Sequence, residues 1–359
     1  MKRDWFLLGA VLALAVFGLL FQVRLARTVA DGGGVTLLLA GCVVGGLAAL
    51  ACGKGRLEQV LTRRGALIAG GVACALMIAL LVFGRRYRGG LYLPGRINPS
   101  EFVKLCVVAF TAGFWARRLT GRDLATWTGV MGLIAGLVAL AGDFGLLAQL
   151  ALTVAVMLFV ASWGWGLAAM GVLVAGIACV ATHPTGHLAT RFAVWKNPLA
   201  DVTGAGWQTL QSLTAVVAGG WTGSGYGLGD VQRVPIVSSD FIYAALAEDL
   251  GVVGCMVILG VWLFVWLRGL VIALRTEERG ALRSALVATG IVASLAIQAI
   301  LNVAGVLNTL PMTGITLPLI SHGGSSLLTT LLMCGILFGL SDTSEAAEKS
   351  RKRSRAAKR

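Results

Sequence analysis

Long apolar runs separated by short polar segments make up most of the chain. Windows of about 20 residues, the length with which a helix crosses a bilayer, occur ten times in the 359 residues. The predicted spans are 5–23, 35–52, 66–83, 102–116, 125–141, 144–162, 165–182, 241–266, 284–306 and 323–340. This pattern predicts an all-α fold: a polytopic integral membrane protein with about ten transmembrane helices and one large extracytoplasmic loop at about 183–239. We expect residues 1–341 to form a single ten-span membrane domain, followed by a basic cytoplasmic tail over 342–359.

The segment that leads into the last predicted span, NTLPMTGITLPLISHGGSSLL, is apolar in its middle but rich in residues that break helices. Proline removes a backbone donor and glycine loosens a helix, so a continuous span is not expected here. Irregular backbone at membrane depth persists only where it is buried in protein or lines a watery cavity. The sequence therefore predicts a broken, re-entrant segment that borders a site. Its structural motif residues are Pro311, Thr313, Gly314, Pro318, Gly323 and Gly324.

Composition and charge agree with a membrane protein. Hydrophobic residues make up 57% of the chain and charged residues only 13%. About two-thirds of the 30 Lys and Arg residues fall in segments that are cytoplasmic if the N-terminus lies inside. Because cytoplasmic loops carry the excess of basic residues, both termini are predicted to be cytoplasmic. The basic tail EKSRKRSRAAKR is then interpreted as a topology anchor beside anionic membrane lipid, in preference to an arm that binds nucleic acid.

One outer segment breaks this charge pattern. It lies between the third and fourth predicted spans, and five basic residues fall in it or just beyond it: Arg85, Arg86, Arg88, Arg96 and Lys104. Cations that face outward against the usual rule indicate an anionic ligand. Glu101 precedes Lys104 by three residues, so the two side chains can also share a helical face as a structural ion pair. Both interpretations stay open.

Two other patterns need no special function. The first apolar run, behind Lys2 and Arg3, resembles a signal peptide, but the many later spans favour an uncleaved first helix. The seven cysteines lack metal-ligand spacing, so neither a metal site nor a disulfide framework is predicted.

The large outer loop has two distinct parts. Residues 207–217 have the character of an amphipathic helix lying on the membrane. The glycines that follow, in GGWTGSGYGLG, allow the backbone either to approach a ligand or to pack tightly.

Acidic residues are few enough to consider one by one. Eight fall in predicted cytoplasmic segments, where a solvated surface role suffices: Asp4, Glu58, Asp123, Glu277, Glu278, Asp342, Glu345 and Glu348. Turn formation or helix capping accounts for four more: Asp31, Asp143, Asp201 and Asp230. Glu248 and Asp249 fall inside the eighth predicted span, where buried acids must pair or line a polar cavity.

Asp240 stands where the large outer loop enters the eighth predicted span, in the sequence SSDFIYAALAEDLG. It has the position of an N-cap for that helix. It has equally the position of a carboxylate that does chemistry at the outer face of the membrane. The residues alone leave both interpretations open.

Four motifs, in order along the chain, resemble the SEDS family (shape, elongation, division and sporulation). INPSEFVKL resembles the family's QPSE-x-x-K motif, with Asn98 in place of glutamine. GWQTLQSLTAVVAGGWTGSGYGLG resembles its GYQ, QS and GG-x-x-G-x-GLG segment, and DFIYAALAEDLGVVG resembles DFIF-x-x-x-x-EELG-x-x-G. The broken segment, extended back through Gln298 and Asn302, resembles LP-x-TG-x-x-LP and S-aromatic-GGSS, with His322 in the usual tyrosine position.

The resemblance implies a peptidoglycan glycosyltransferase in the bacterial cytoplasmic membrane, which polymerises lipid II for elongation, division or sporulation. Lipid II is a disaccharide peptide linked to undecaprenyl pyrophosphate, and the implied partner is a class B penicillin-binding transpeptidase. The aspartate of DFIF is the family's catalytic residue and maps onto Asp240. No cofactor is implied, and a divalent-cation requirement stays open. The substrate-binding residues proposed with this function are Lys104, Glu101, Arg88, Arg96, Gln208, Gln211, Ser325 and Ser326.

The chain departs from the family pattern just before Asp240. It has PIVSS where the family has proline, glutamate, any residue, histidine and threonine. A divergent paralogue with an altered partner or reduced activity is therefore one interpretation. Two other functions stay open: a flippase for lipid-linked precursors, since broken helices also mark transport sites, and a non-catalytic scaffold that activates a partner enzyme.

Overall fold

The computed structural model describes residues 3–28, 34–52, 56–87, 90–94, 97–116, 119–182, 186–230 and 233–342. The basic tail beyond residue 342 lies outside this part of the chain. The elements are α1 (Trp5–Thr28), α2 (Gly34–Cys52), α3 (Arg56–Val60), α4 (Arg63–Phe83), β1 (Arg85–Tyr87), β2 (Gly90–Tyr92), α5 (Ser100–Trp115), α6 (Gly121–Ala141), α7 (Phe144–Ala161), α8 (Trp163–Thr182), α9 (His187–Lys196), the short 3-10 helix η1 (Pro198–Asp201), α10 (Trp207–Gly219), α11 (Ile242–Glu278), α12 (Leu282–Val306) and α13 (Gly324–Leu340).

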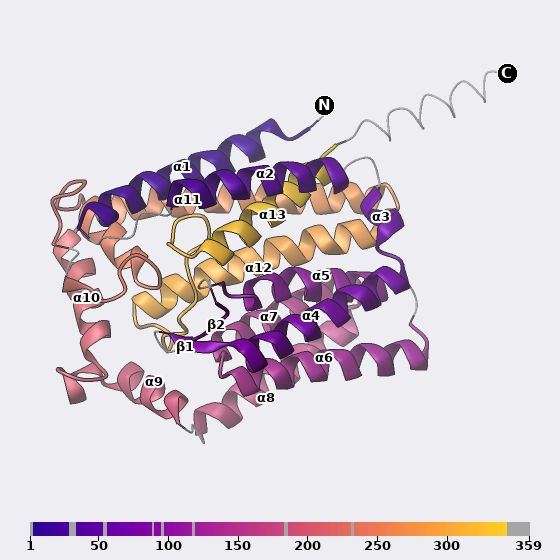
Figure 1. The fold of residues 1–359 in the computed structure, drawn as a ribbon, viewed down its shortest axis with the longest axis horizontal. Coiled ribbons are helices and arrows are strands. Elements are labelled where there is room, and N and C mark those ends of the chain that lie inside the picture. The colour runs from indigo at the N-terminus through magenta and orange to yellow at the C-terminus, as the bar shows by residue number, and fades with distance from the viewer. Residues whose placement is uncertain are drawn as a thin grey trace.

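Each predicted span coincides with one long helix, so the all-α, polytopic prediction is confirmed. Within the described residues, six helices are long and apolar enough to cross a membrane: α1, α4, α6, α7, α11 and α12. The only pairing between named strands in this part of the chain is the short antiparallel hairpin of β1 and β2. The helices lie side by side, with α9 and α10 at one end and α3 toward the other (Figure 1).

The two ends of the described chain are joined at one end of the bundle. The Arg3 guanidinium lies 3.6 Å from the Asp342 carboxylate. The backbone N–H of Asp4 donates to Ser341 Oγ at 2.9 Å. The first and last described residues therefore lie at the same end of the helix bundle, as expected for an even number of spans.

Helix α12 is the centre of the bundle, and it packs against α5, α7, α11 and α13. Its sequence, LRSALVATGIVASLAIQAILNVAGV, alternates small and branched apolar residues that let neighbouring helices approach closely. Gln298 and Asn302 are buried polar residues on this helix. They are four residues apart and share one face, so the central helix carries two amides toward the same side.

Small residues also bring α2 and α13 together. A Cβ added at Gly335 would lie 2.1 Å from the carbonyl oxygen of Gly45, and one at Gly339 would lie 2.5 Å from that of Ala49. Backbone contact of this kind needs glycine on at least one helix, as in the small-xxx-small pattern of membrane helices. The glycine spacing in CGILFGL thus serves helix packing.

The glycine-rich loop after α10 packs against a kink in α11. At Gly251 the backbone is non-helical, with φ 66° and ψ −174°, a conformation that glycine adopts readily. The kink frees backbone groups, and the loop pairs with them. Ser224 N–H donates to the Glu248 carbonyl at 2.8 Å, and Val252 N–H donates to the Gly220 carbonyl at 3.0 Å. The sequence predicts that this glycine run either approaches a ligand or packs tightly. The described contacts are those of tight packing.

The acids beside the kink also bind this loop. Asp249 pairs with Arg24 of α1 (Oδ2 to Nη1, 3.0 Å) and accepts from the Gly227 N–H at 3.2 Å. Glu248 accepts from the Asp230 N–H at 2.8 Å. The prediction that these buried acids pair is thus confirmed for Asp249, whereas Glu248 binds a backbone N–H of the loop.

The large outer loop contains the helices α9, η1 and α10, and α10 coincides with the helix predicted over 207–217. Two other predictions need correction. Helix α11 continues to Glu278, well beyond the predicted end at 266. Arg268, in this extension, pairs with Asp4 (Nη2 to Oδ2, 2.6 Å), so Asp4 is buried where a solvated role was predicted.

Asp123 was also predicted to be solvated, and this too was wrong. It is buried, pairs with Arg63 and forms a capping box with Thr120 at the start of α6. The reason is the same as for Asp4: helices extend past their apolar windows, so that acids at their ends meet arginines of neighbouring helices.

Candidate active site

Asp240 lies two residues before the first residue of α11, and Phe241 holds the N-cap position of that helix. The backbone carbonyl of Asp240 accepts from Asn302 Nδ2 at 2.9 Å. Its carboxylate lies beside the broken segment, where Oδ2 is 3.7 Å from the position of a Cβ added at Gly314. Asp240 therefore stands where the start of α11 meets the broken segment.

The residues just before Asp240 are fastened to the broken segment by hydrogen bonds. Ser321 Oγ donates to the Ser239 carbonyl at 2.7 Å. The backbone N–H of His322 donates to the Ser238 carbonyl at 2.7 Å. These bonds use backbone carbonyls, so they place Asp240 without requiring the glutamate and histidine that the chain lacks at this point.

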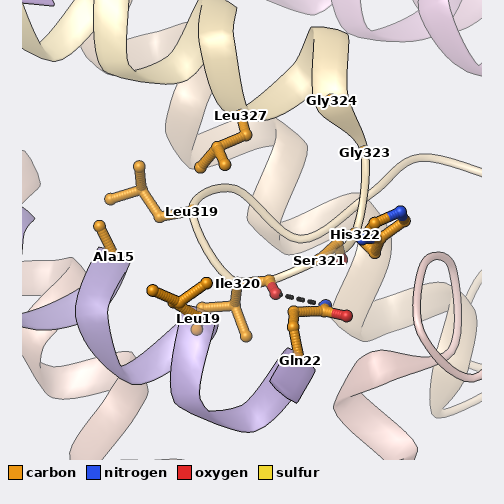
Figure 2. A pocket seen from close by; sticks show the side chains of 11 residues that line it. Ala15, Leu19, Gln22, Leu319, Ile320, Ser321, His322, Gly323, Gly324 and Leu327 are labelled. Atoms are coloured by element: carbon orange, nitrogen blue, oxygen red, sulfur yellow. Dashed lines mark hydrogen bonds between the residues drawn. The ribbon is translucent and has the colours of Figure 1, made fainter. Parts of the chain in front are cut away.

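A small pocket separates α1 from the same segment, and Figure 2 shows its lining. Gln22 reaches from α1 toward the loop, and its Nε2 donates to the carbonyls of Ile320 at 2.8 Å and Ser238 at 3.0 Å. The approach is close, because a Cβ added at Gly18 would lie 2.4 Å from the Leu319 carbonyl oxygen. Helix α1 therefore supports the segment from the side opposite Asn302.

The broken segment itself runs without regular structure from the end of α12 to Gly323, as predicted. Asn302 holds it through the Ile315 carbonyl (Nδ2 to O, 2.7 Å). Pro318 lies in a buried turn, whereas Pro311 is half-buried. The freed backbone groups are bound by side chains of the bundle, which is how irregular backbone at this depth is stabilised.

Gln298 joins the other predicted residues into one network. Its Oε1 accepts from Lys104 Nζ at 3.0 Å, and its Nε2 donates to Ser326 Oγ at 3.2 Å. Ser325 Oγ accepts from the Asn98 N–H at 2.9 Å. The INPSEFVKL and SHGGSS motifs, more than two hundred residues apart, therefore meet in the structure.

Lys104 and Glu101 form the ion pair that their spacing predicts, with Nζ 2.7 Å from Oε2. Lys104 is only 3% exposed, and Glu101 is half-buried. The ammonium thus has a carboxylate and an amide oxygen as partners before any ligand arrives. Its assignment to substrate binding stays a prediction.

Arg191 is a site residue that the sequence analysis missed. It lies on α9, its side chain is exposed, and its Nη1 donates to the Thr313 carbonyl at 3.1 Å. Its Nη2 lies 3.8 Å from the position of a Cβ at Gly314, the same point that Asp240 approaches. The signal in the sequence is a basic residue in a predicted outer loop that carries little charge. The sequence analysis uses this charge argument only for the segment after α4.

Asp143 caps α7 as predicted, because its Oδ1 accepts from the Leu146 N–H at 2.9 Å. Burial raises the pKa of Asp143 and the nearby Glu101 carboxylate raises it further, while the bond from Leu146 and the charges of Lys104 and Arg191 lower it. Asp143, Glu101, Lys104 and Arg191 therefore share one electrostatic neighbourhood.

Of the remaining predicted residues, two lie on α10 and two lie outside the described part of the chain. Gln208 is exposed and Gln211 half-buried on α10, which lies at the edge of the bundle (Figure 1) and packs mainly on α11. Arg88 and Arg96 lie outside the described residues. Among the residues that the structure describes, no group of three or more His, Cys, Asp or Glu has the arrangement of a metal site.

Comparison with known proteins gives a consistent result. A family model for FtsW, RodA and SpoVE, described as "Cell cycle protein", matches residues 63–346. The probable peptidoglycan glycosyltransferase FtsW of Alkalilimnicola ehrlichii is 31% identical over 99% of this chain and 93% of its own length. The peptidoglycan glycosyltransferase RodA of Mycobacterium tuberculosis is 35% identical over 73% of this chain and 59% of its own.

Two solved structures share the fold. A chain of a peptidoglycan synthase complex that coordinates polymerization and crosslinking superposes with a TM-score of 0.76, at 24% identity, over 95% of this chain and 98% of that one. The rod shape determining protein RodA of Thermus thermophilus superposes with a TM-score of 0.66, also at 24% identity, over 95% and 97%. The helix arrangement around Asp240 is thus that of known polytopic membrane proteins.

Proposed function

The chain belongs to the SEDS family, the family of FtsW, RodA and SpoVE, and from this premise we propose that it is a peptidoglycan glycosyltransferase that polymerises lipid II into glycan strands. The observation that carries the proposal is the position of Asp240. Its carboxylate stands beside the broken segment, and Phe241 holds the N-cap position of the helix that follows. A carboxylate at the edge of irregular backbone that borders a site is suited to chemistry at that point.

We propose that Asp240 is the general base of an inverting transfer. It takes the proton from a sugar hydroxyl of the acceptor, whose oxygen forms a bond to the anomeric carbon of the donor. The bond from that carbon to the pyrophosphate oxygen breaks, and the lipid pyrophosphate leaves with the electron pair. One carboxylate suffices because pyrophosphate is a stable anion, whereas glycosidases need a second carboxyl group to protonate a poor leaving group.

The polar network beside Asp240 is the proposed wall of the substrate cavity. Ser325 and Ser326 stand at the start of α13 and bond to Asn98 and Gln298. Lys104 and Glu101 extend the wall from α5. We assign these groups to binding and orienting the lipid-linked sugars, since rigid, satisfied side chains hold a reacting group in position better than mobile ones.

We further propose that the Asp240 end of the bundle faces outward and that both termini are in the cytoplasm of a bacterial cell. The two-to-one bias of Lys and Arg supports this orientation, as does the junction of Arg3 with Asp342 at the opposite end. A class B penicillin-binding transpeptidase is the proposed partner, in keeping with the structurally similar chain of a peptidoglycan synthase complex.

The test is a polymerisation assay with the purified full-length protein and lipid II, first without any transpeptidase. We expect glycan strands from the wild type and none from Asp240→Ala. A scaffold that only activates a partner would give no polymer in any reaction in which it is the sole protein. A flippase would give no polymer either, but would move labelled lipid II across proteoliposomes in both wild type and variant.

A further inference from the structure

Arg191 and Asp240 approach the same glycine from two different parts of the fold. A Cβ at Gly314 would be 3.8 Å from Arg191 Nη2 and 3.7 Å from Asp240 Oδ2. Gly314 has φ 75° and is exposed, so the turn presents bare backbone between a cation and a carboxylate. A ligand atom that passes over this turn is within reach of both groups.

Arg191 is held in place through neutral contacts. Its Nη1 donates to the Thr313 carbonyl, and α9 is tied to the same segment because Asn308 Nδ2 donates to the Trp195 carbonyl at 3.2 Å. None of the ion pairs among the described residues includes Arg191, whereas Lys104 is paired with Glu101 and Arg24 with Asp249. Arg191 therefore brings a positive charge to the turn that Asp240 also approaches.

The turn beside Arg191 is also rigid. A Cβ at Gly145 of α7 would lie 2.7 Å from the Thr313 carbonyl oxygen, so α7 supports the turn from behind, and Asn302 holds Ile315 just after it. The Thr313 hydroxyl has no hydrogen-bond partner among the described residues. A guanidinium has five N–H donors and a planar fork that matches a phosphate, so Nη1 serves the Thr313 carbonyl while Nη2 lies near the exposed Gly314.

We propose that Arg191, with the Thr313–Gly314 turn, binds the pyrophosphate of the lipid-linked donor and stabilises it as it leaves. This inference rests on the proposed transferase function and names the group that takes the developing negative charge. As the donor's carbon–oxygen bond breaks, the electron pair moves to the pyrophosphate oxygen, and a fixed cation there stabilises the transition state more than the bound substrate. Asp240 acts at the acceptor hydroxyl, on the other side of the same carbon.

A binding experiment tests the proposal separately from catalysis. The purified full-length protein is titrated with a polyprenyl pyrophosphate and with the corresponding uncharged polyprenol, and binding is followed by tryptophan fluorescence. We expect Arg191→Gln to weaken pyrophosphate binding by about tenfold or more, the usual loss for a hydrogen bond to a charged group. Binding of the polyprenol and the Tm should be unchanged, and Arg191→Lys should recover part of the affinity.

Lys196→Gln is the matched control, because Lys196 is an exposed cation at the end of the same helix. It should bind the pyrophosphate lipid as the wild type does. The proposal is overturned if Arg191→Gln keeps wild-type affinity, if it loses affinity equally for the polyprenol, or if Lys196→Gln has the same effect.

Asp240→Asn separates this proposal from the proposed function. We expect it to bind the pyrophosphate lipid normally and to make no polymer. If Asp240→Asn makes polymer while Arg191→Gln loses pyrophosphate binding, the assignment of the base is wrong and the anion site stands. If Asp240→Asn makes no polymer while Arg191→Gln binds normally, the base stands and the anion site is wrong.

Discussion

Two groups of acids flank the first two turns of α11, and the structure uses them differently. Glu248 and Asp249, at the kink, bind backbone N–H groups of the glycine-rich loop, and Asp249 also pairs with Arg24. Asp240, just before the helix, is held by its backbone carbonyl and those of its neighbours. Its carboxylate lies toward the exposed Gly314.

The difference separates acids whose carboxylates bind the fold from the acid that we propose as the base. At the kink, the carboxylates themselves make the bonds to the glycine-rich loop and to Arg24, so their removal should destabilise the fold. Before the helix, backbone carbonyls make the bonds to the surrounding residues, and the Asp240 carboxylate lies at the edge of the broken segment. A burial argument alone does not separate the two, because both groups are on or next to a membrane helix.

Asp240→Asn is the sharpest way to break this comparison. The amide keeps the shape of the side chain but does not accept a proton at neutral pH, and a general base contributes about 10²–10⁴-fold to rate. We expect polymerisation to fall by that factor while the Tm in detergent stays at the wild-type value. If the variant kept a tenth of the wild-type rate or more, Asp240 would not be the general base and its role would be structural.

Asp249→Ala should have the opposite profile. The variant leaves the Arg24 guanidinium, whose side chain is 12% exposed, without its carboxylate partner. Breaking a buried pair in this way costs about 3–5 kcal/mol of stability. We expect a large drop in Tm, with polymerisation per folded molecule reduced far less than by Asp240→Asn.

Arg233→Ala is its control, since the Arg233–Asp230 pair is exposed and such pairs contribute about 0–1 kcal/mol. Equal drops in Tm for the two variants would contradict a fastening role for Asp249.

The Glu101–Lys104 pair could serve either stability or substrate binding. Two single variants distinguish these roles. Glu101→Ala leaves an ammonium that is 3% exposed with only the Gln298 oxygen as partner, so it should lower the Tm more than Lys104→Ala. Lys104→Ala should lower polymerisation more, because it removes a positive charge near an anionic leaving group. If the activity losses simply follow the order of the Tm losses, the pair is structural.

Asp143→Asn is expected to have the smallest effect. Because burial raises the pKa of Asp143, its charged form opposes folding, and this penalty is present above the raised pKa and is lost as the pH falls through it. Asparagine keeps the N-cap without the charge. At pH 7 we expect a rise in Tm of about 1–3 °C, which corresponds to a stabilisation of at most about 1 kcal/mol. This rise in Tm should disappear in acid. A pH-independent difference would contradict the charge argument.

Local properties of the sequence were sufficient for the helices, the break before α13 and the Glu101–Lys104 pair. Apolar windows, the prolines of the broken segment and an i, i+3 spacing act over a few residues, so they can be recognised without knowing the fold. The motif around Asp240 is also local, and it singles out this carboxylate as the candidate base.

What the tertiary structure alone decided depends on contacts between distant segments. Arg24 meets Asp249 across 225 residues, and Arg191 meets Thr313 across 122. No local pattern predicts such pairs, because they follow from how helices pack. Where α11 begins relative to Asp240 was undecided for the same reason. The helix begins beyond it because Ser238 and Ser239 are bound to the segment at Ser321 and His322, and that segment is placed by α1 and α12.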